Sequence, residues 1–381
     1  MEPIYFFDHA ATTRVLPEAA QAALRAMTED YGNPSSLYAL GTRAAKALAA
    51  HREAVAQALG CQAGEVIFTS GGTEGDNWAI SLAAHLGRHR GKHIITTAVE
   101  HAAVLEPCKA LEAQGYQVTY LTPGPDGRVK VADLEAALRP DTVLVSMMLV
   151  NNETGAIQPV KEAGQVLRRC RSQALLHTDA IQGFLKIPFT PKALGVDLLT
   201  VSGHKIGAMK GSGALYLRAG LRAVPLLRGG GQEKGLRSGT EPTPQIAALA
   251  AACTLGKAAL EDHQTYLTHL KTYALAAFQK AVPGLVVVAA GDAPHICAIS
   301  LPGYPSQVVV RWLSDQGFCL SAGSACHRGQ ASHVYAAMGL SKPVRDGMLR
   351  VSFGPENTQE EVDRLAQALG TATQVLLPAG R

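Results

Sequence analysis

Short apolar runs alternate with amphipathic stretches between about residues 65 and 217. The runs are rich in β-branched residues, which favour strands over helices. They predict strands over residues 66–69, 93–97, 117–120, 142–145, 174–177 and 198–201.

Apolar positions between these runs recur at helical spacing. One predicted helical face holds Val104, Leu105, Cys108 and Leu111. A second holds Val160, Ala163, Val166, Leu167 and Cys170. Strand and helix alternating this often predict an α/β fold, with a mainly parallel sheet covered by helices on both faces.

The pattern changes after residue 217, where a Gly-rich stretch and an Ala-rich helical segment follow. Further strands are predicted near residues 298–301 and 349–352, and Thr358 and Glu361 form a capping-box pattern at the start of a last helix. The chain has 381 residues, which suits two or three domains of about 150 residues each. We expect a large α/β domain over residues 1–257 and a small α+β domain over residues 258–381, with roughly the first 15 residues packed against the small domain.

Composition narrows the class of protein. Charged residues make up 17% of the chain, and 35 basic against 31 acidic residues leave a net charge of +4 that is spread thinly. The chain has no basic tract of the kind that binds nucleic acids, so we expect a small-molecule ligand. The N-terminus has no secretory pattern, and no apolar run approaches the roughly 18 residues of a membrane span. Seven irregularly spaced cysteines without a Cys-x-x-Cys pair favour reduced thiols in the cytoplasm.

Polar residues follow the predicted strands at the point where each strand ends. Ligands of parallel sheets bind beyond the carboxyl ends of the strands, so these residues are the candidates for chemistry. The segments are 70–74, 100–101, 151–153, 179–182 and 202–205.

Lys205 and Asp179 follow successive predicted strands. A partly desolvated lysine can form a Schiff base, although a lysine beside apolar sequence more often extends its ammonium group to water. Asp179 changes this balance, because pyridoxal phosphate needs a carboxylate beside its pyridine nitrogen. The pair therefore predicts a pyridoxal phosphate site.

Gly72 and Thr73 follow a strand and open a helix, which suits a phosphate group but is also ordinary helix-start chemistry. His101 could stack on an aromatic ring and transfer protons near neutral pH, or it could cap a helix.

Cys326 lies in a stretch of small and polar residues beside His327 and Arg328, a setting that favours a reactive thiolate. The thiol of Cys319, in an apolar run, is expected to pack. Arg350 could bind a substrate carboxylate through two hydrogen bonds, or it could form a surface ion pair.

Taken together, these residues resemble the cysteine desulfurases, pyridoxal phosphate enzymes of the aspartate aminotransferase fold (fold type I, class V aminotransferases). The resemblance extends from the segment 7–13 to the segment 350–354. The residues Ser324-Ala325-Cys326 resemble class I, the iron-sulfur-cluster and nitrogen-fixation type, and the chain lacks the Arg-x-Gly-His-His-Cys pattern of class II. The shared motifs are Glu-His at 100–101, Asn-Asn-Glu at 151–153, Asp-Ala-Ile-Gln at 179–182, Ser-Gly-His-Lys at 202–205 and Arg-Ser-Gly-Thr at 237–240.

The resemblance implies a large domain built on a mainly parallel, seven-stranded type of sheet, and it implies roles around the cofactor ring. Lys205 would hold pyridoxal 5'-phosphate as a Schiff base, Asp179 would pair with its ring nitrogen, and Gln182 would bond its phenolic oxygen. His101 would stack on the ring. No metal is implied.

The resemblance also implies roles at the phosphate and the substrate. Asn152 and Arg350 would bind the carboxylate of L-cysteine, and Cys326 would take its sulfur as a persulfide and release L-alanine. Thr240 would reach the phosphate in the neighbouring subunit of a homodimer. The phosphate would be held within the chain by Gly72, Thr73, Ser202 and His204.

Three alternatives stay open. The chain could be a selenocysteine lyase or another aminotransferase-like enzyme of this fold, which would not need the thiol of Cys326. It could also be a sulfur-relay scaffold, although Lys205, Asp179 and His101 together argue for an enzyme. The sulfur acceptor could be an iron-sulfur scaffold, a tRNA-thiolation relay or a DNA-phosphorothioation protein. Neither membrane association nor direct nucleic-acid binding is expected.

Overall fold

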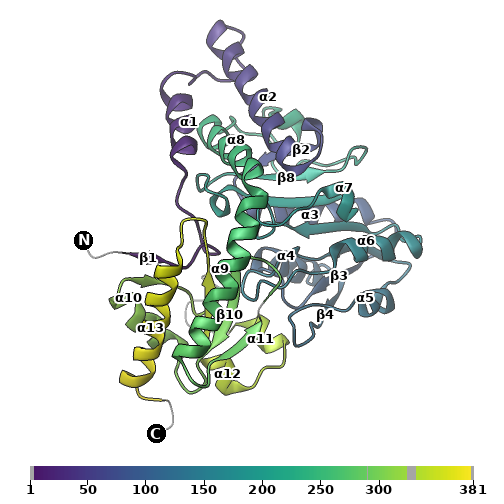
Figure 1. Cartoon of the computed structure of the whole chain (residues 1–381). Helices are drawn as coiled ribbons and strands as arrows, with labels where there is room; N and C mark the ends of the chain where they lie inside the picture. Colours follow the sequence, from purple (N-terminus) through teal and green to yellow (C-terminus); the bar gives the residue numbers. More distant parts are fainter. Residues whose placement is uncertain (1–3, 290, 324–331, 379–381) are drawn as a thin grey trace.

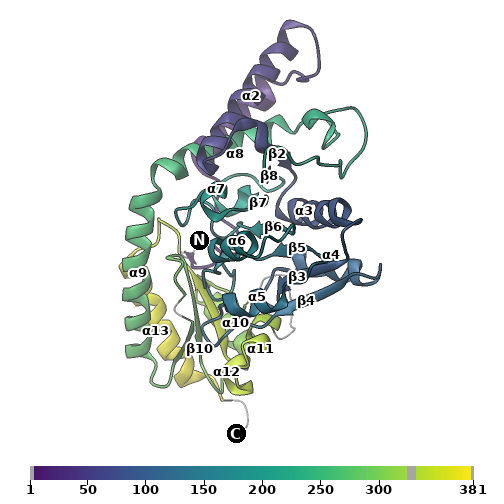
Figure 2. The same ribbon diagram turned by 90° about the vertical axis from the view of Figure 1, so that its right-hand side faces the viewer.

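The structure is a computed structural model, and it describes residues 4–289, 291–323 and 332–378. Its centre is a seven-stranded sheet (Figure 1), and the order of the strands is β2-β8-β7-β6-β5-β3-β4 (Figure 2). All neighbouring strands run parallel except β8, which is antiparallel to both β2 and β7. The strands are β2 (Val66–Thr69), β3 (His93–Thr97), β4 (Gln117–Leu121), β5 (Thr142–Ser146), β6 (Leu175–Asp179), β7 (Leu198–Ser202) and β8 (Gly213–Leu217).

The six strands predicted from apolar runs are confirmed, and so is the mainly parallel sheet. Four of them end one or two residues later than predicted, which makes Asp179 and Ser202 the last residues of β6 and β7. Strand β8 was not predicted, because its sequence Gly-Ala-Leu-Tyr-Leu contains no β-branched residue and directly follows a Gly-rich turn.

Helices cover both faces of this sheet (Figure 2), as predicted. Alternate residues of each strand enter different cores, because successive side chains of a strand point to opposite faces. Leu175 and Leu198 pack with α3 and α4, whereas Leu176 and Leu199 pack in the core that contains α2, α6 and α8. The helices are α2 (Ala39–Leu59), α3 (Gly72–Gly87), α4 (Ala102–Glu112), α5 (Val131–Ala137), α6 (Val160–Arg169), α7 (Pro191–Leu194) and α8 (Thr243–Ala258).

One predicted helical face needs correction. Val160, Ala163, Val166 and Leu167 are buried as expected, but Cys170 is exposed. Helix α6 ends at Arg169, and Cys170 caps its carboxyl end outside the helix. The helical spacing of apolar residues in the sequence therefore continues one residue beyond the end of α6.

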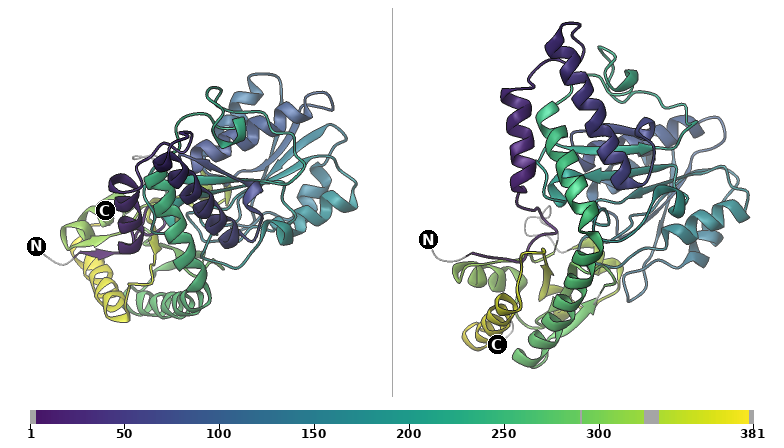
Figure 3. Two further views of the ribbon diagram at one scale, coloured as in Figure 1. Left: turned by 90° about the horizontal axis from the view of Figure 1, so that it is seen from above. Right: turned by 45° about the horizontal axis from the view of Figure 1, so that its top comes forward.

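A second core lies around an antiparallel sheet in the order β12-β10-β9. Helix α9 follows α8 almost directly and leads from the large sheet to this smaller one (Figure 3). We propose the domain boundary between residues 257 and 258, near the junction of α8 and α9. The elements of this part are β9 (Val286–Ala289), β10 (Ile296–Ser300), β12 (Met348–Ser352), α9 (Leu260–Ala281), α10 (Ser306–Asp315), α11 (His333–Ala337), α12 (Lys342–Asp346) and α13 (Gln359–Val375).

The N-terminal segment links the two cores. Strand β1 (Tyr5–Phe6) pairs in parallel with β11 (Phe318–Cys319), and Phe7 is buried in the second core. The chain then crosses to the large sheet, where the Thr13 backbone N–H donates to the His204 carbonyl over 2.9 Å. Helix α1 (Pro17–Thr28) follows and packs against α8.

No helix in the described ranges is both long and apolar enough to cross a membrane.

Candidate active site

A cavity of about 240 Å³ lies at the carboxyl ends of the parallel strands, where the sequence predicts the site. The predicted site residues line it, with two exceptions. Thr240 is exposed in the loop before α8, and Cys326 lies outside the described residues. The cavity is lined by Ala10, Ala11, Gly72, Thr73, His101, Met148, Asn152, Asp179, Ile181, Gln182, Ser202, His204, Lys205 and Arg350.

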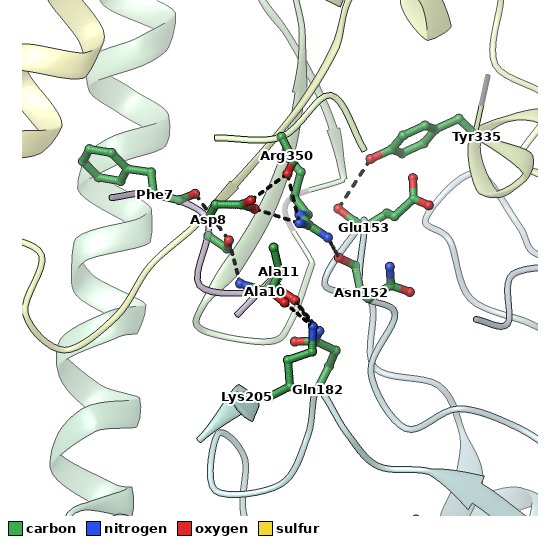
Figure 4. Close-up of polar contacts among 12 residues, drawn as sticks. Phe7, Asp8, Ala10, Ala11, Asn152, Glu153, Gln182, Lys205, Tyr335 and Arg350 are labelled. Carbon is green, nitrogen blue, oxygen red and sulfur yellow. Dashed lines mark hydrogen bonds and ion pairs between the residues drawn. The ribbon is translucent and has the colours of Figure 1, made fainter. Parts of the chain in front are cut away.

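Lys205 enters the cavity from the short turn that follows β7. Its Nζ donates to the carbonyl oxygens of Ala10 and Ala11, each over 2.7 Å, and Gln182 Nε2 donates to the Ala10 oxygen over 2.9 Å (Figure 4). The N-terminal segment therefore forms one wall of the site. Sequence reasoning assigned no role to Ala10 and Ala11, because their contribution comes from backbone carbonyls that carry no side-chain signal.

Asp179 is the last residue of β6 and is 5% exposed. Burial and the neighbouring carboxylate of Asp76 raise the pKa of Asp179 to about 7, although His101 and Lys205 act in the opposite direction. A cationic group placed beside this carboxylate would favour its ionised form. The site is therefore suited to a ligand that presents a protonated nitrogen to Asp179.

His101 is the N-cap residue of α4, and its Nδ1 accepts the backbone N–H of Ala103 over 3.1 Å. The helix-cap alternative is therefore right, and the same ring also lines the cavity. Because Nδ1 accepts, a neutral His101 ring carries its proton on Nε2. The cap holds the ring in place and sets its tautomer.

Helix α3 starts at the edge of the cavity with Gly72 and Thr73. A Cβ atom at Gly72 would overlap the Ile181 side chain, so only glycine lets the helix start this close to the sheet. Burial, together with Lys205 and Lys210, lowers the pKa of His204 to about 4, so this ring is neutral at pH 7. Backbone N–H groups at the positive end of a helix, with the hydroxyls of Thr73 and Ser202 nearby, suit a phosphate group.

Arg350 lies on β12 and is 1% exposed, which excludes the surface ion pair. Its Nη1 donates to the Asn152 carbonyl over 2.9 Å, and its Nη2 donates to Asp8 Oδ1 over 2.7 Å and to Ser321 Oγ over 3.2 Å. The Ser321 hydroxyl donates in turn to Asp8 Oδ2 over 2.8 Å. Asp8 and Ser321 therefore hold one end of the guanidinium group (Figure 4 shows Asp8), while Nε has no hydrogen-bond partner among the described residues.

Comparison with known proteins assigns the chain to a family. The family model described as aminotransferase class-V matches residues 5–365. The chain belongs to the aminotransferase class-V family. Enzymes of this family depend on pyridoxal phosphate, and the curated relatives at about 40% identity carry the name cysteine desulfurase.

Two such relatives match nearly the whole chain. The cysteine desulfurase IscS of Methanosarcina thermophila is 40% identical, over 97% of this chain and 92% of that protein. A cysteine desulfurase of Trichormus azollae is 41% identical, over 96% of this chain and 92% of its own length.

Solved structures agree with this assignment. A NifS-like protein superimposes with a TM-score of 0.93 at 34% identity and covers 98% of this chain and 100% of its own. DndA of Streptomyces lividans superimposes with a TM-score of 0.76 at 39% identity, over 90% of this chain and 97% of that one. SspA in complex with cysteine gives a TM-score of 0.80 at 32% identity, over 93% of this chain and 99% of that one.

The cavity fits the cofactor of this class-V family. It offers a lysine amine, a buried carboxylate at Asp179, an aromatic ring at His101 and a helix start that a Cβ atom at Gly72 would obstruct. In the same order, these groups suit the aldehyde, the ring nitrogen, the ring face and the phosphate of pyridoxal phosphate. Among the described residues, no cluster of His, Cys, Asp and Glu is arranged to hold a metal ion.

Proposed function

We propose that this protein is a sulfurtransferase that converts L-cysteine to L-alanine and takes the sulfur onto Cys326 as a persulfide. The observation that carries the proposal is the convergence of Lys205, Asp179, His101 and a buried Arg350 on one cavity. The names of the relatives supply the substrate, and the structural neighbour SspA is a complex with cysteine.

We assign the cofactor contacts as follows. Lys205 would hold pyridoxal phosphate covalently, Asp179 would hold the proton on the ring nitrogen, and Gln182 would bond the phenolic oxygen of the ring. When bound, the cofactor supplies an electron sink that makes the bonds around the substrate's α- and β-carbons labile. Thr73 at the start of α3, Ser202 and the neutral His204 would hold the phosphate.

The substrate carboxylate binds at Arg350 and Asn152. Arg350 has a fixed orientation because Asp8 and Ser321 hold one edge of its guanidinium group. Nε has no partner among the described residues, which leaves a buried donor for a carboxylate. A charged hydrogen bond of this kind, shielded from water, is stronger than one at the surface.

Proton transfer falls to two groups in reach of the cavity. Lys205 Nζ, when it is not bonded to the cofactor, would take the proton from the substrate's α-carbon, and His101 Nε2 would donate a proton at the cavity. The cap from Ala103 N–H to Nδ1 keeps the His101 proton on Nε2.

The sulfur step balances without an external oxidant. The Cys326 thiolate attacks the sulfur of the bound substrate, an S–S bond forms, and the C–S bond breaks. The electron pair of that bond stays on the substrate carbon, which then takes a proton and leaves as alanine. Cys326 is left as a persulfide, and an acceptor protein takes its outer sulfur.

Assembly and sulfur transfer follow the same model. Thr240, exposed in this chain, contributes to the phosphate site of a second copy, so the active form is a homodimer. The persulfide passes to an acceptor protein, either an iron-sulfur scaffold or a thiolation or phosphorothioation relay. We place this activity in the cytoplasm.

The direct test is to supply L-cysteine and a thiol acceptor and to measure alanine and sulfide. We expect equal amounts of both, and a Cys326→Ser variant that makes neither. Turnover of L-selenocysteine with L-cysteine unused would indicate a selenocysteine lyase. An absence of turnover with either substrate would favour the scaffold.

A further inference from the structure

A second buried carboxylate, Asp76, lies behind the cofactor site. Asp76 sits in the first half of α3 and is 0% exposed, and neither of its carboxylate oxygens has a hydrogen-bond partner among the described residues. Its nearest recorded polar contact is His177 Nε2, 3.5 Å from Oδ1. A buried carboxylate without hydrogen bonds is costly, so it calls for a function.

The sheet brings Asp76 and Asp179 to the same side. His177 and Asp179 are two residues apart on β6, so both side chains point to the face that packs on α3. Gly75 lets α3 approach this face, because a Cβ atom there would lie 2.5 Å from Cγ2 of Thr200. The neighbouring Asp76 contacts His177 on β6, the strand that carries Asp179.

The His177 ring beside Asp76 has defined hydrogen bonds. Its Nδ1 lies 2.8 Å from Ser146 Oγ, and its Nε2 lies 3.2 Å from Thr200 Oγ1. The ring of His177 therefore forms hydrogen bonds with the two hydroxyls, and both carboxylate oxygens of Asp76 stay without a hydrogen bond among the described residues.

We propose that Asp76 is a positioning residue that supplies a second buried negative charge and so strengthens the hold of Asp179 on the protonated ring nitrogen of the cofactor. This inference rests on the proposed cofactor site but not on the sulfur chemistry. Its physical basis is that a negative charge in a medium of low dielectric raises the proton affinity of every site near it.

Asp76 raises the pKa of two other buried carboxyl groups. Asp76 raises the pKa of Asp179, and it also contributes to the raised pKa of Glu100, whose main cause is burial. His177 faces Asp76 from β6, whereas His101 and Lys205 face Asp179 from the cavity side and lower its pKa. A pyridine nitrogen placed between the cavity and Asp179 would experience both carboxylates.

The test is the protonation state of the ring nitrogen in the holoenzyme. Protein loaded with pyridoxal phosphate that carries ¹⁵N in its ring is titrated by NMR, since the ¹⁵N shift separates the protonated from the neutral ring. For Asp76→Asn we expect the midpoint pH to fall by about one unit or more, which is tenfold or more in proton affinity. The cofactor should also dissociate more readily, which equilibrium dialysis measures.

Asp197→Asn is the matched control. Asp197 also contacts β6, where its Oδ2 accepts the Leu176 N–H over 2.8 Å, but it lies at the opposite end of the strand from Asp179. We expect its midpoint to equal that of the wild type. Asp76→Ser removes the same charge and serves if Asp76→Asn does not fold.

An unchanged midpoint in a folded Asp76 variant would overturn the proposal and leave Asp76 with a packing role only. A lowered midpoint supports it even if the protein has no desulfurase activity, because the measurement requires bound cofactor and no turnover. The two proposals can therefore fail separately.

Discussion

Asp8 lies outside the sequence-predicted set of site residues, yet the structure makes it the support of the substrate-binding arginine. Its carboxylate contacts Arg350 Nη2 over 2.7 Å and the Ser321 hydroxyl over 2.8 Å. The Arg350 side chain is 2% exposed and that of Asp8 is 17% exposed, so the pair is largely shielded from water. We predict that Asp8→Ala weakens the binding of L-cysteine by releasing Arg350 from its fixed orientation.

The size of the effect follows from the contacts. Loss of one well-oriented, charged hydrogen bond costs about 1.5–3 kcal/mol. At about 1.4 kcal/mol for each factor of ten, the KM for L-cysteine should rise roughly ten- to a hundredfold. The kcat should change little, because the carboxylate contact is made equally in the ground state and the transition state. Unfolding free energy should fall by about 3 kcal/mol, since Arg350 loses the partner of a buried ion pair.

Two variants make the assay specific. Asp8→Asn keeps an oxygen that can accept from Nη2, so its KM should rise by less than that of Asp8→Ala. Asp363→Asn changes a carboxylate at the surface that accepts from the Tyr273 hydroxyl, and its KM should equal that of the wild type. Steady-state alanine production at varied L-cysteine gives both constants. A wild-type KM in a folded Asp8→Ala protein would refute the positioning role.

Three further outcomes are expected. Lys205→Ala should lose turnover, and borohydride reduction of the wild type should attach the cofactor to the peptide that contains Lys205; a label on Lys210 instead would move the site. The folded protein raises the pKa of Asp179 from 3.8 to about 7, so this group destabilises the folded state increasingly as pH rises through that range. Cofactor-free Asp179→Asn should therefore melt at a higher temperature than the wild type at pH 8, but not at pH 4. Equal melting temperatures at pH 8 would argue against that shift. Mixing inactive Lys205→Ala and Thr240→Ala chains should restore about one intact site per mixed dimer, and mixtures that stay inactive would contradict a shared site.

The main features of the fold could be predicted because they depend on local patterns. Six strands of the large sheet are short runs with many apolar and β-branched residues, and residues at the carboxyl ends of several of them carry the polar groups of the site. The capping box at Thr358 and Glu361 is present at the start of α13. These features need only neighbouring residues to be recognised.

Other features depend on distant parts of the chain. Asp8 meets Arg350 across a sequence separation of 342 residues, and the carbonyl groups of Ala10 and Ala11 meet Lys205 across about 195. Asp76 lies in the same motif region as Gly72 and Thr73, but only the packing of α3 on β6 shows that it faces His177. No local pattern contains such contacts, so they required the structure.

The central claim is that Cys326 accepts the sulfur of L-cysteine, and peptide mass spectrometry tests it most directly. Holoenzyme is treated with L-cysteine, blocked with an alkylating reagent and digested, with Cys326→Ser and Cys319→Ser treated in parallel. We predict one added sulfur on the Cys326 peptide in the wild type and in Cys319→Ser, and none in Cys326→Ser, which should still hold the cofactor. Added sulfur on Cys319 or on the exposed Cys170 with Cys326 unmodified, or full alanine production by Cys326→Ser, would contradict the claim.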